Sequence, residues 1–449
     1  MTRFLKCIPN HPTVSKLWSA MTWNGISIFA AIPPALLFVM PLIASVSIAF
    51  TPTNTYIMSL RHVQNILPVF ALTALFCTIG KQTGEKYPLK RIVSDRRSQL
   101  WFLAFSAWLL LSTAVNGFTQ AARIGDEYRL ESVWTFISYG LLYYTCGTAV
   151  RTEHVKKWLY RILIAGSTLV AAAALLDFYD IIAFAPFRGG RGTEGTLFAI
   201  FHQYNHYAYF LLFSILMSAG LAVYEKHKAA RLFACISLFV NTVTLTVNTT
   251  RGVILACIAA LAAFYIILRL TDRTQSNRLR LAVAIFLAGS ITGILLNPHV
   301  LGRFWNMLLD LFGIAEEETR LNAGSGRGVL WKTTLEAISE KPLLGWGTEG
   351  ISDRLLATRY NNDRPHNEYL QYAAFYGIPA LILYLGANIS VFRKAYRQRM
   401  KLRPMTVIAL VAASGYLISA FFGNTMYYTA PYFFVVLGFA FQSELPEKQ

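Results

Sequence analysis

A short polar segment stands where the chain passes from a long polar stretch into a run of apolar residues. Its sequence, RPHNEY, begins at Arg364 and contains His366, Asn367 and Glu368. A histidine can accept a proton near neutral pH, and an amide and a carboxylate beside it can orient its ring. We therefore take His366 as a candidate general base that Asn367 and Glu368 orient. The alternative interpretation is a histidine that only makes a structural hydrogen bond.

A second polar segment, FHQYNHYAY, precedes another apolar run and carries His202, Asn205 and His206. Amide and imidazole groups can donate and accept hydrogen bonds and so suit sugar hydroxyls. We expect Asn205 and His206 to line a cleft for the sugar or the acceptor. For these histidines too, a structural role is the alternative.

Five arginines lie in four separate polar segments between the apolar runs, two of these segments being in the long connection over residues 297–365. They are Arg188 and Arg191 in PFRGGRGTEGT, Arg251 in NTTRG, Arg327 in GSGRG and Arg364 in RPHNEY. A guanidinium can bind two phosphate oxygens at once, and nearby glycines let backbone N–H groups approach an anion. Together these residues predict a diphosphate site. The alternative for each arginine is a side chain that reaches to the membrane interface.

Membrane helices are the elements that must position these residues. The chain is 55% hydrophobic and 14% charged, whereas a soluble domain carries about 25% charged residues. Its apolar residues form long uninterrupted runs, each near the ~20 residues with which a helix crosses the hydrocarbon. We predict an all-α integral membrane protein, a single polytopic domain over residues 1–449 with about twelve spans. The spans are 25–50, 63–80, 99–117, 132–150, 158–179, 204–224, 232–249, 252–269, 281–296, 367–392, 405–423 and 427–442. The tenth span contains Gly377 and Pro379, so we expect a kink or a break there.

The basic residues predict the orientation of the chain. When the connections are numbered alternately from the inside, the inner set holds 26 of the 41 Lys and Arg residues. Because short basic loops stay in the cytoplasm, both termini are expected there and the candidate residues at the outer face. Topology and attraction to anionic lipid thus account for the net charge of +18, which argues against a nucleic-acid partner.

The connection over residues 297–365 is far longer than membrane spanning requires, and loops of this length are usually functional. Apolar residues at helical spacing predict a short helix over 330–342, ending at Pro342. The five cysteines show no CxxC spacing, and the other outer connections lack acidic clusters of metal-ligand type. We therefore predict neither a disulfide framework nor a metal site.

The segment SGRGVLWKTTLEAISEKPLLGWGTEG, followed by RPHNEYLQYAAFYGIPALILYLG, resembles the O-antigen ligase and polymerase superfamily of bacterial membrane proteins. The outer loop of that family carries an arginine, a tryptophan, a P-x-x-G-x-G turn and an HN-x-aromatic-L segment. The matching residues here are Arg327, Trp331, 342–347 and 366–370. NTTRGVILA resembles the family's Ser-Arg-Gly segment, with Thr250 in place of the serine. The resemblance covers residues 185–385.

The resemblance implies a GT-C-like polytopic glycosyltransferase. Such an enzyme would move a glycan from undecaprenyl diphosphate to an acceptor hydroxyl, without a metal or other cofactor, at the outer face of the bacterial cytoplasmic membrane. His366 would be the base, and Arg191 and Arg251, with Arg188 beside them, would bind the donor diphosphate. Arg327 and Arg364 would share that role or hold the loop.

We take ligation to a separate acceptor as the leading interpretation. A polymerase of lipid-linked repeat units, as in O-antigen or capsular polysaccharide, is the alternative, because the two differ only in the acceptor. A lipid or solute transporter would need ionisable residues near mid-span, and the predicted spans are nearly free of them. A scaffold without chemistry would not need arginines in four separate segments at the outer face.

Overall fold

The helices of the protein follow the apolar runs of its sequence. The computed structural model describes residues 22–46, 61, 63, 65–74, 76–78, 81, 97–125, 130–183, 197–201, 203–312, 326–425 and 427–441. No β-strand occurs among these residues. The helices are α3 (Trp23–Ala30), α4 (Ile32–Val46), α7 (Arg97–Val115), α8 (Gln120–Ile124), α9 (Val133–Thr148), α10 (Glu153–Phe178), α11 (Tyr204–Tyr224), α12 (Lys228–Asn248), α13 (Arg251–Thr271), α14 (Arg273–Leu296), α15 (His299–Phe312), α17 (Arg327–Glu340), α18 (Ser352–Leu356), α19 (Glu368–Tyr376), α20 (Ile378–Arg397), α21 (Pro404–Ala420) and α22 (Ala430–Phe441).

Six helical segments of the described chain are long and apolar enough to cross a membrane, as expected for a multi-pass membrane protein. They are Trp23–Ser45, Glu153–Phe178, Tyr204–Tyr224, Lys228–Asn248, Arg251–Arg269 and Arg273–Leu296. Shorter apolar helices lie at Asn65–Thr78, Gln99–Val115, Pro404–Ala420 and Ala430–Phe441. The predicted span 132–150 corresponds to α9, which has only 16 residues. The predicted span 367–392 corresponds to two helices, α19 and α20. The number twelve therefore stays a prediction.

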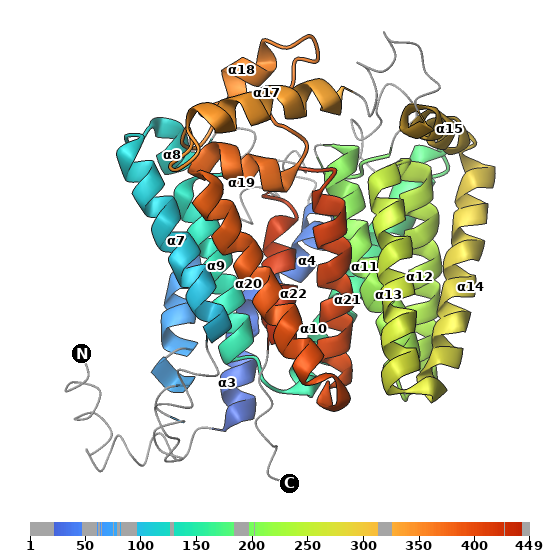
Figure 1. Ribbon diagram of the computed structural model, residues 1–449. Helices are drawn as coiled ribbons and strands as arrows, with labels where there is room; N and C mark the ends of the chain where they lie inside the picture. The colour runs from blue at the N-terminus through green and yellow to red at the C-terminus, as the bar shows by residue number, and fades with distance from the viewer. Residues whose placement is uncertain are drawn as a thin grey trace, which may run out of the picture.

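The long helices stand side by side in one bundle, with α11 near its centre (Figure 1). In the most apolar segment of α11, 94% of the residues are buried, whereas only 28% are buried in the corresponding segment of α14. Helix α11 is apolar on all sides, which suits a helix surrounded by others. Its first residues are consequently held among neighbouring helices.

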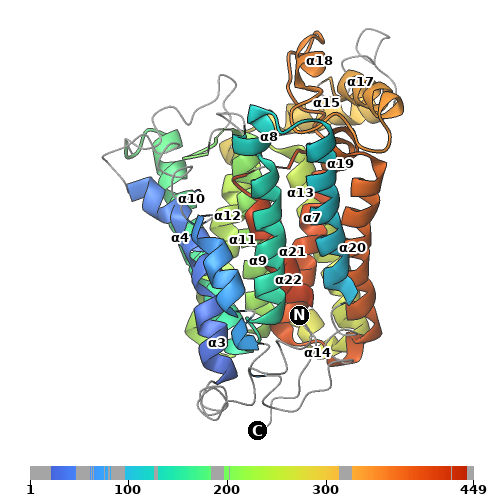
Figure 2. The same ribbon diagram turned by 90° about the vertical axis from the view of Figure 1, so that its left-hand side faces the viewer.

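Helices α15, α17 and α18 lie beyond one end of the bundle, which we name the loop end (Figures 1 and 2). Helix α17 lies across this end and confirms the short helix predicted over 330–342. The opposite end holds the beginning of α3 and the end of α22. There the Ser27 hydroxyl donates to the carbonyl of Ala149 at 2.9 Å, and the Phe441 ring lies 5.8 Å from that of Tyr143. The first and last described helices thus both contact the C-terminal half of α9 or the residue after it, at the end away from α17.

The predicted break in the tenth span is present. Helix α19 ends at Tyr376, Gly377 has a φ of +88°, and α20 begins at the next residue. A Cβ atom at Gly377 would lie 1.8 Å from the carbonyl oxygen of Leu343. The break is therefore a close backbone contact that only glycine permits.

The contact at Gly377 belongs to a larger junction between the P-x-x-G-x-G turn and the end of α19. The backbone N–H groups of Trp346 and Gly347 donate to carbonyls of the last turn of α19, at 2.9 and 2.8 Å. The N–H of Ile378 donates to the carbonyl of Pro342 at 2.8 Å. The turn thereby satisfies carbonyls that a helix end leaves without partners. It also fixes α17 relative to the segment that carries His366.

Candidate active site

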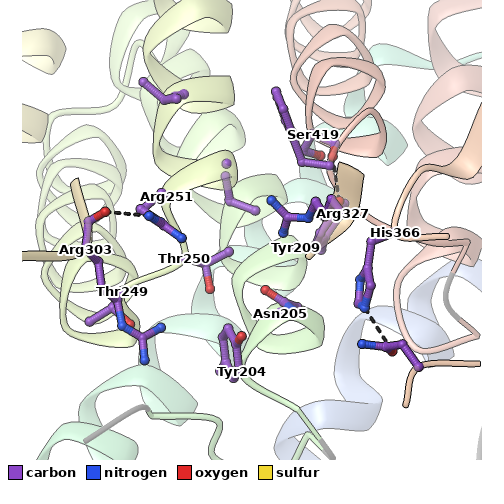
Figure 3. Close-up of a pocket in the computed structure, with 15 residues that line it drawn as sticks. Tyr204, Asn205, Tyr209, Thr249, Thr250, Arg251, Arg303, Arg327, His366 and Ser419 are labelled. Carbon is purple, nitrogen blue, oxygen red and sulfur yellow. Dashed lines mark hydrogen bonds between the residues drawn. The ribbon is translucent and has the colours of Figure 1, made fainter. Parts of the chain in front are cut away.

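A cavity of about 250 Å³ opens at the loop end, among segments far apart in the sequence. It brings together four of the predicted residues, Asn205, Arg251, Arg327 and His366. In Figure 3, Arg251 and Arg303 lie on one side of the cavity and His366 on the other, with Arg327 and Asn205 between them. The lining residues are Tyr204, Asn205, Tyr209, Thr249, Thr250, Arg251, Gly252, Val253, Leu255, Arg303, Arg327, Asn362, His366, Ser419 and Phe422.

Three helices begin at this cavity: α11 at Tyr204, α13 at Arg251 and α17 at Arg327. A fourth, α19, begins two residues after His366. The first N–H groups of a helix have no partners within it, and the helix dipole makes this end positive. The backbone alone therefore favours an anion at this place, before any side-chain charge is considered.

The side chain of Arg251 is held between α13 and α15. It is the first residue of α13, after Thr250, whose hydroxyl donates to the side chain of Asn248 at 2.5 Å. The amide of Asn248 in turn donates to the carbonyl of Tyr204 at 2.9 Å, which ties the start of α13 to the start of α11. One guanidinium nitrogen of Arg251 donates to the carbonyl of Arg303 at 2.5 Å. This fixed position leaves the guanidinium fork at the cavity wall.

Arg327 is the first residue of α17, and its guanidinium has no hydrogen bond or ion pair with any residue that the structure describes. Its neighbour Gly326 has a φ of +80°, and a Cβ atom there would lie 2.3 Å from the ring of Tyr360. Burial lowers the pKa of the Arg327 guanidinium, but arginine stays protonated at any physiological pH. A partly buried cation of this kind gains free energy when an anion binds beside it.

Arg303 is a lining residue that the sequence did not single out. It lies on α15, and its guanidinium carbon is 5.9 Å from the centre of the Tyr204 ring. The only signal for it is its position soon after the apolar run of α14, at the beginning of the long loop. The described lining of the cavity thus includes three arginines from three elements.

His366 lines the cavity opposite Arg251, and its backbone has a φ of +51°. This left-handed conformation is uncommon for residues other than glycine and is often found at functional sites. Its Nε2 atom lies 3.1 Å from the side-chain oxygen of Asn362, and its Nδ1 atom lies 3.4 Å from the amide nitrogen of Asn424. These two amides, rather than the predicted Asn367 and Glu368, are the groups beside the ring.

Comparison with known families adds to this geometry. The model of the O-antigen ligase family matches residues 236–385. The match supports the family predicted from the sequence over these residues, and it suggests an O-antigen ligase or polymerase-like function. The matched segment includes Arg251, Arg303, Arg327 and His366, and it begins later than the predicted 185–385. A search of curated proteins gave no match.

Arg364 of the O-antigen ligase segment does not line the cavity. Its side chain is fully buried and forms a two-pronged ion pair with Glu349. Glu131 and Asp363 lie 3.4 and 3.6 Å from the same guanidinium. Burial alone would lower the pKa of Arg364, but Glu349 and Glu131 outweigh it and raise that pKa. Arg364 in turn holds the pKa of the Glu349 carboxyl below its usual range, against the effect of burial. Of its two predicted roles, this position favours holding the loop.

Three other predicted residues are placed by the structure outside the cavity lining. His206 is buried and stacks on the ring of Tyr428 at 4.9 Å. The side chain of Asn367 accepts from the N–H of Leu370 and caps α19. Glu368 is fully buried and accepts hydrogen bonds from the hydroxyls of Tyr384 and Tyr416, at 2.7 and 2.8 Å. Asn367 and Glu368 therefore fix the start of α19 instead of contacting the ring of His366.

The remaining predictions concern residues without a described position or groups that could bind a metal. Arg188 and Arg191, predicted to bind the donor, lie outside the residues that the structure describes. Over the described ranges, no group of three or more His, Cys, Asp or Glu side chains is arranged to hold a metal ion. The described part of the first cavity therefore offers guanidinium groups and helix N-termini as partners for phosphate oxygens.

Proposed function

We propose that the protein transfers a glycan from undecaprenyl diphosphate to an acceptor hydroxyl at the outer face of the cytoplasmic membrane, as a ligase. One observation carries this proposal. The guanidinium groups of Arg251, Arg303 and Arg327 line one cavity with the imidazole of His366, where helix N-termini converge. Cations with a base beside them suit a reaction in which a diphosphate leaves and a hydroxyl loses its proton.

The reaction is one displacement at C1 of the donor sugar. The acceptor oxygen forms a bond to C1 while the bond between C1 and the diphosphate oxygen breaks, and the diphosphate leaves with the electron pair. His366 takes the proton of the acceptor hydroxyl. Negative charge grows on the leaving diphosphate, so fixed guanidinium groups stabilise the transition state more than the bound substrate. A single displacement of this kind inverts the configuration at C1.

The surroundings of His366 fit the role of a general base. In the tautomer whose Nε2–H donates to Asn362, the lone pair lies on Nδ1 and accepts a long hydrogen bond of 3.4 Å from the amide of Asn424, which an acceptor hydroxyl would have to displace. A base that a third group orients is the arrangement found in activated nucleophile systems. We assign the proton transfer to this nitrogen, and to Asn362 the role of fixing the tautomer.

The position of the cavity fits a lipid-linked donor. Its lining includes the first residues of α11, α13 and α17, and these helix ends lie at the loop end of a bundle of apolar helices (Figure 1). The polyprenyl tail of the donor stays in the hydrocarbon, while its sugars are in water. The bond between sugar and diphosphate must therefore be broken at a boundary such as the loop end.

The test is a transfer assay with the purified full chain. The substrates are an undecaprenyl-diphosphate-linked repeat unit alone, and the same donor with a separate glycan acceptor. We expect transfer only when the separate acceptor is present, and no transfer by His366→Ala at an unchanged melting temperature. A ladder of lengthened lipid-linked products without that acceptor would instead identify a polymerase.

Two outcomes would contradict the proposal as a whole. One is full transfer by the His366→Ala variant, which would remove the base from the mechanism. The other is the absence of any transfer by protein that is shown to bind the donor, which would favour a transporter.

A further inference from the structure

A second cavity of about 240 Å³ lies at the loop end, away from the residues of the active site. It is formed by the connection between α7 and α8 on one side and by residues 346–350 on the other. The lining residues are Thr113, Asn116, Gly117, Thr119, Ala121, Ala122, Trp346, Gly347, Thr348, Glu349 and Gly350. No residue lines both cavities.

The wall of the second cavity has the chemistry of a sugar-binding site. Among the described residues, the polar and aromatic side chains of the wall are three hydroxyls, one amide, one carboxylate and one indole, and the remaining residues are alanine and glycine. Hydroxyl and amide groups can donate to and accept from the hydroxyls of a sugar, and an indole packs against the C–H groups of a pyranose ring. The hydroxyl of Thr113, whose side chain is 1% exposed, has no hydrogen-bond partner within the described chain. A volume below the roughly 300–1,000 Å³ of drug-sized pockets suits one monosaccharide.

The charges of this wall point to a neutral sugar. No lysine or arginine is among the described lining residues, so an acidic sugar or a phosphate would find no cation in the wall itself. The nearest cations, Lys341 and Arg354, lie over the ring of Trp346, at 4.0 and 5.8 Å from its centre. The single carboxylate, Glu349, is already neutralised by its ion pair with Arg364. A cationic amino sugar would have to compete with Arg364 for it.

Helix α17 sets the separation of the two cavities. Arg327, at its beginning, lines the active site, and the indole N–H of Trp346 donates to the carbonyl of Ala337 at 2.8 Å. The ten residues from Arg327 to Ala337 span about 15 Å at 1.5 Å per residue. The two cavities are therefore a few sugar units apart, and both lie at the loop end of the bundle.

The second cavity is also joined to the segment that carries the base. Glu349 lines the cavity, and its partner Arg364 lies two residues before His366. The hydroxyl of Thr348, another lining residue, hydrogen-bonds the hydroxyl of Tyr376 on α19 at 2.8 Å. A ligand in this cavity would therefore rest on the same buried network that fixes His366.

We propose that this second cavity binds one neutral monosaccharide of a glycan chain, a few units away from the sugar that reacts. The inference rests on the proposed function for its role, because a glycan must reach from one cavity to the other. The site holds the chain in line and selects for the identity of that unit. The chain belongs either to the donor or to the acceptor.

Binding is tested first, without any transfer. Saturation-transfer NMR of the full chain in detergent is recorded with free N-acetylglucosamine, glucose, galactose and glucuronic acid. We expect a signal from at least one neutral sugar and none from glucuronic acid. The signal should remain in His366→Ala and disappear in Ala121→Phe, which places a ring in the cavity. Gln120→Phe is the matched control, because Gln120 is the exposed neighbour on α8 and does not line the cavity.

A second variant guards against a folding defect in Ala121→Phe. Thr113→Val keeps the shape of the side chain and removes a hydroxyl that makes no hydrogen bond. It should weaken sugar binding at least tenfold at an unchanged melting temperature. No signal from any neutral sugar, or equal signals in the wild type and both variants, would overturn the proposal.

The transfer assay then identifies which chain occupies the site. Donors of one and of several repeat units are compared at a fixed acceptor, and acceptors of different length at a fixed donor. Ala121→Phe should reduce transfer at least tenfold for the longer member of one series only, and that series names the chain. An equal effect on short and long members would contradict the proposal. If neither the wild type nor any variant transfers glycan, the proposed function fails. The NMR result still decides whether the second cavity binds a sugar.

Discussion

Arg327 and Arg364 belong to the same segment of the chain and have opposite surroundings. Arg364 is fully buried, and three carboxylates surround its guanidinium. Arg327 is half-buried at the first cavity and has no ion pair in the described structure. Accordingly the pKa of Arg364 is raised by its carboxylates and that of Arg327 is lowered by burial. An arginine with internal anions stabilises the fold, whereas an arginine that lacks them is suited to bind an anionic ligand.

The largest effect is expected when Arg364, the arginine with internal anions, is removed. Arg364→Ala leaves the buried Glu131 and the half-buried Glu349 without their cation, which should cost about 3–5 kcal/mol of stability. The measurement is the free energy of unfolding in detergent, or the melting temperature. Arg354→Ala is the matched control, because Arg354 forms a two-pronged pair with Glu340 that is exposed to solvent. Equal stability of the two variants would show that the buried network does not hold the loop.

Removing the other member should affect transfer and not stability. Arg327→Ala takes away one group that stabilises the leaving diphosphate, so we expect transfer to fall about 10²–10³-fold, as for the loss of one oxyanion-hole donor. The melting temperature should stay unchanged, because the guanidinium has no described partner to lose. Lys332→Ala removes an exposed positive charge on the same helix and serves as the control. A loss of stability with full activity would reverse the roles of the two arginines.

Arg251 tests whether the shape of the cation matters. Arg251→Lys keeps the charge but loses the fork, and a lost hydrogen bond to a charged group costs about 1.5–3 kcal/mol. Transfer should therefore fall roughly ten- to hundredfold. The initial rate is compared with that of Arg269→Lys, at the opposite end of α13. Full activity of Arg251→Lys would indicate that a point charge at the interface is enough.

The smallest expected effect concerns acid. Because Arg364 lowers the pKa of the Glu349 carboxyl in the folded protein, the pair contributes its stability above the ordinary glutamate pKa of about 4.3 and loses it as the pH falls further. The loss should be on the order of 1 kcal/mol per unit of pKa shift. Melting temperatures measured from pH 7 to pH 3 should show an acid-dependent term that Glu349→Gln lacks and Glu340→Gln keeps. A profile identical in all three proteins would argue against the pair.

Local sequence patterns predicted most of the helices and part of the site. Runs of apolar residues gave α10 to α14, and the Gly377–Pro379 pair gave the break before α20. Arg251, Arg327 and His366 stood out because each lies in a polar segment beside an apolar run. The side chains that each arginine or histidine contacts could not be predicted, because these contacts join residues far apart in the sequence. Glu131 is one of the carboxylates that give Arg364 a structural role, unlike the arginines of the first cavity. It lies 233 positions away from Arg364 in the chain.

Two further residues escaped the sequence for the same reason. Asn424 reaches His366 across 58 positions, and no pattern links the two. Asn362 lies only four positions from His366, within the polar cluster NNDRPH, but nothing in the sequence ranked it above Asn367. The difference is geometric: Asn367 has an extended backbone at a helix N-cap, so its side chain turns toward α19.

The junction at Gly377 has a practical consequence for building chimeras between proteins of this family. The turn that follows α17 is hydrogen-bonded to the last residues of α19, and a glycine makes room for the carbonyl of Leu343. Exchanging the loop alone would pair a foreign turn with a native helix end, and exchanging the helix alone would do the reverse. A chimera that exchanges residues 326–397 as one cassette keeps both the turn after α17 and the end of α19, to which it is hydrogen-bonded. Such a cassette would keep its own backbone contacts when it is placed on the helix bundle of a related protein.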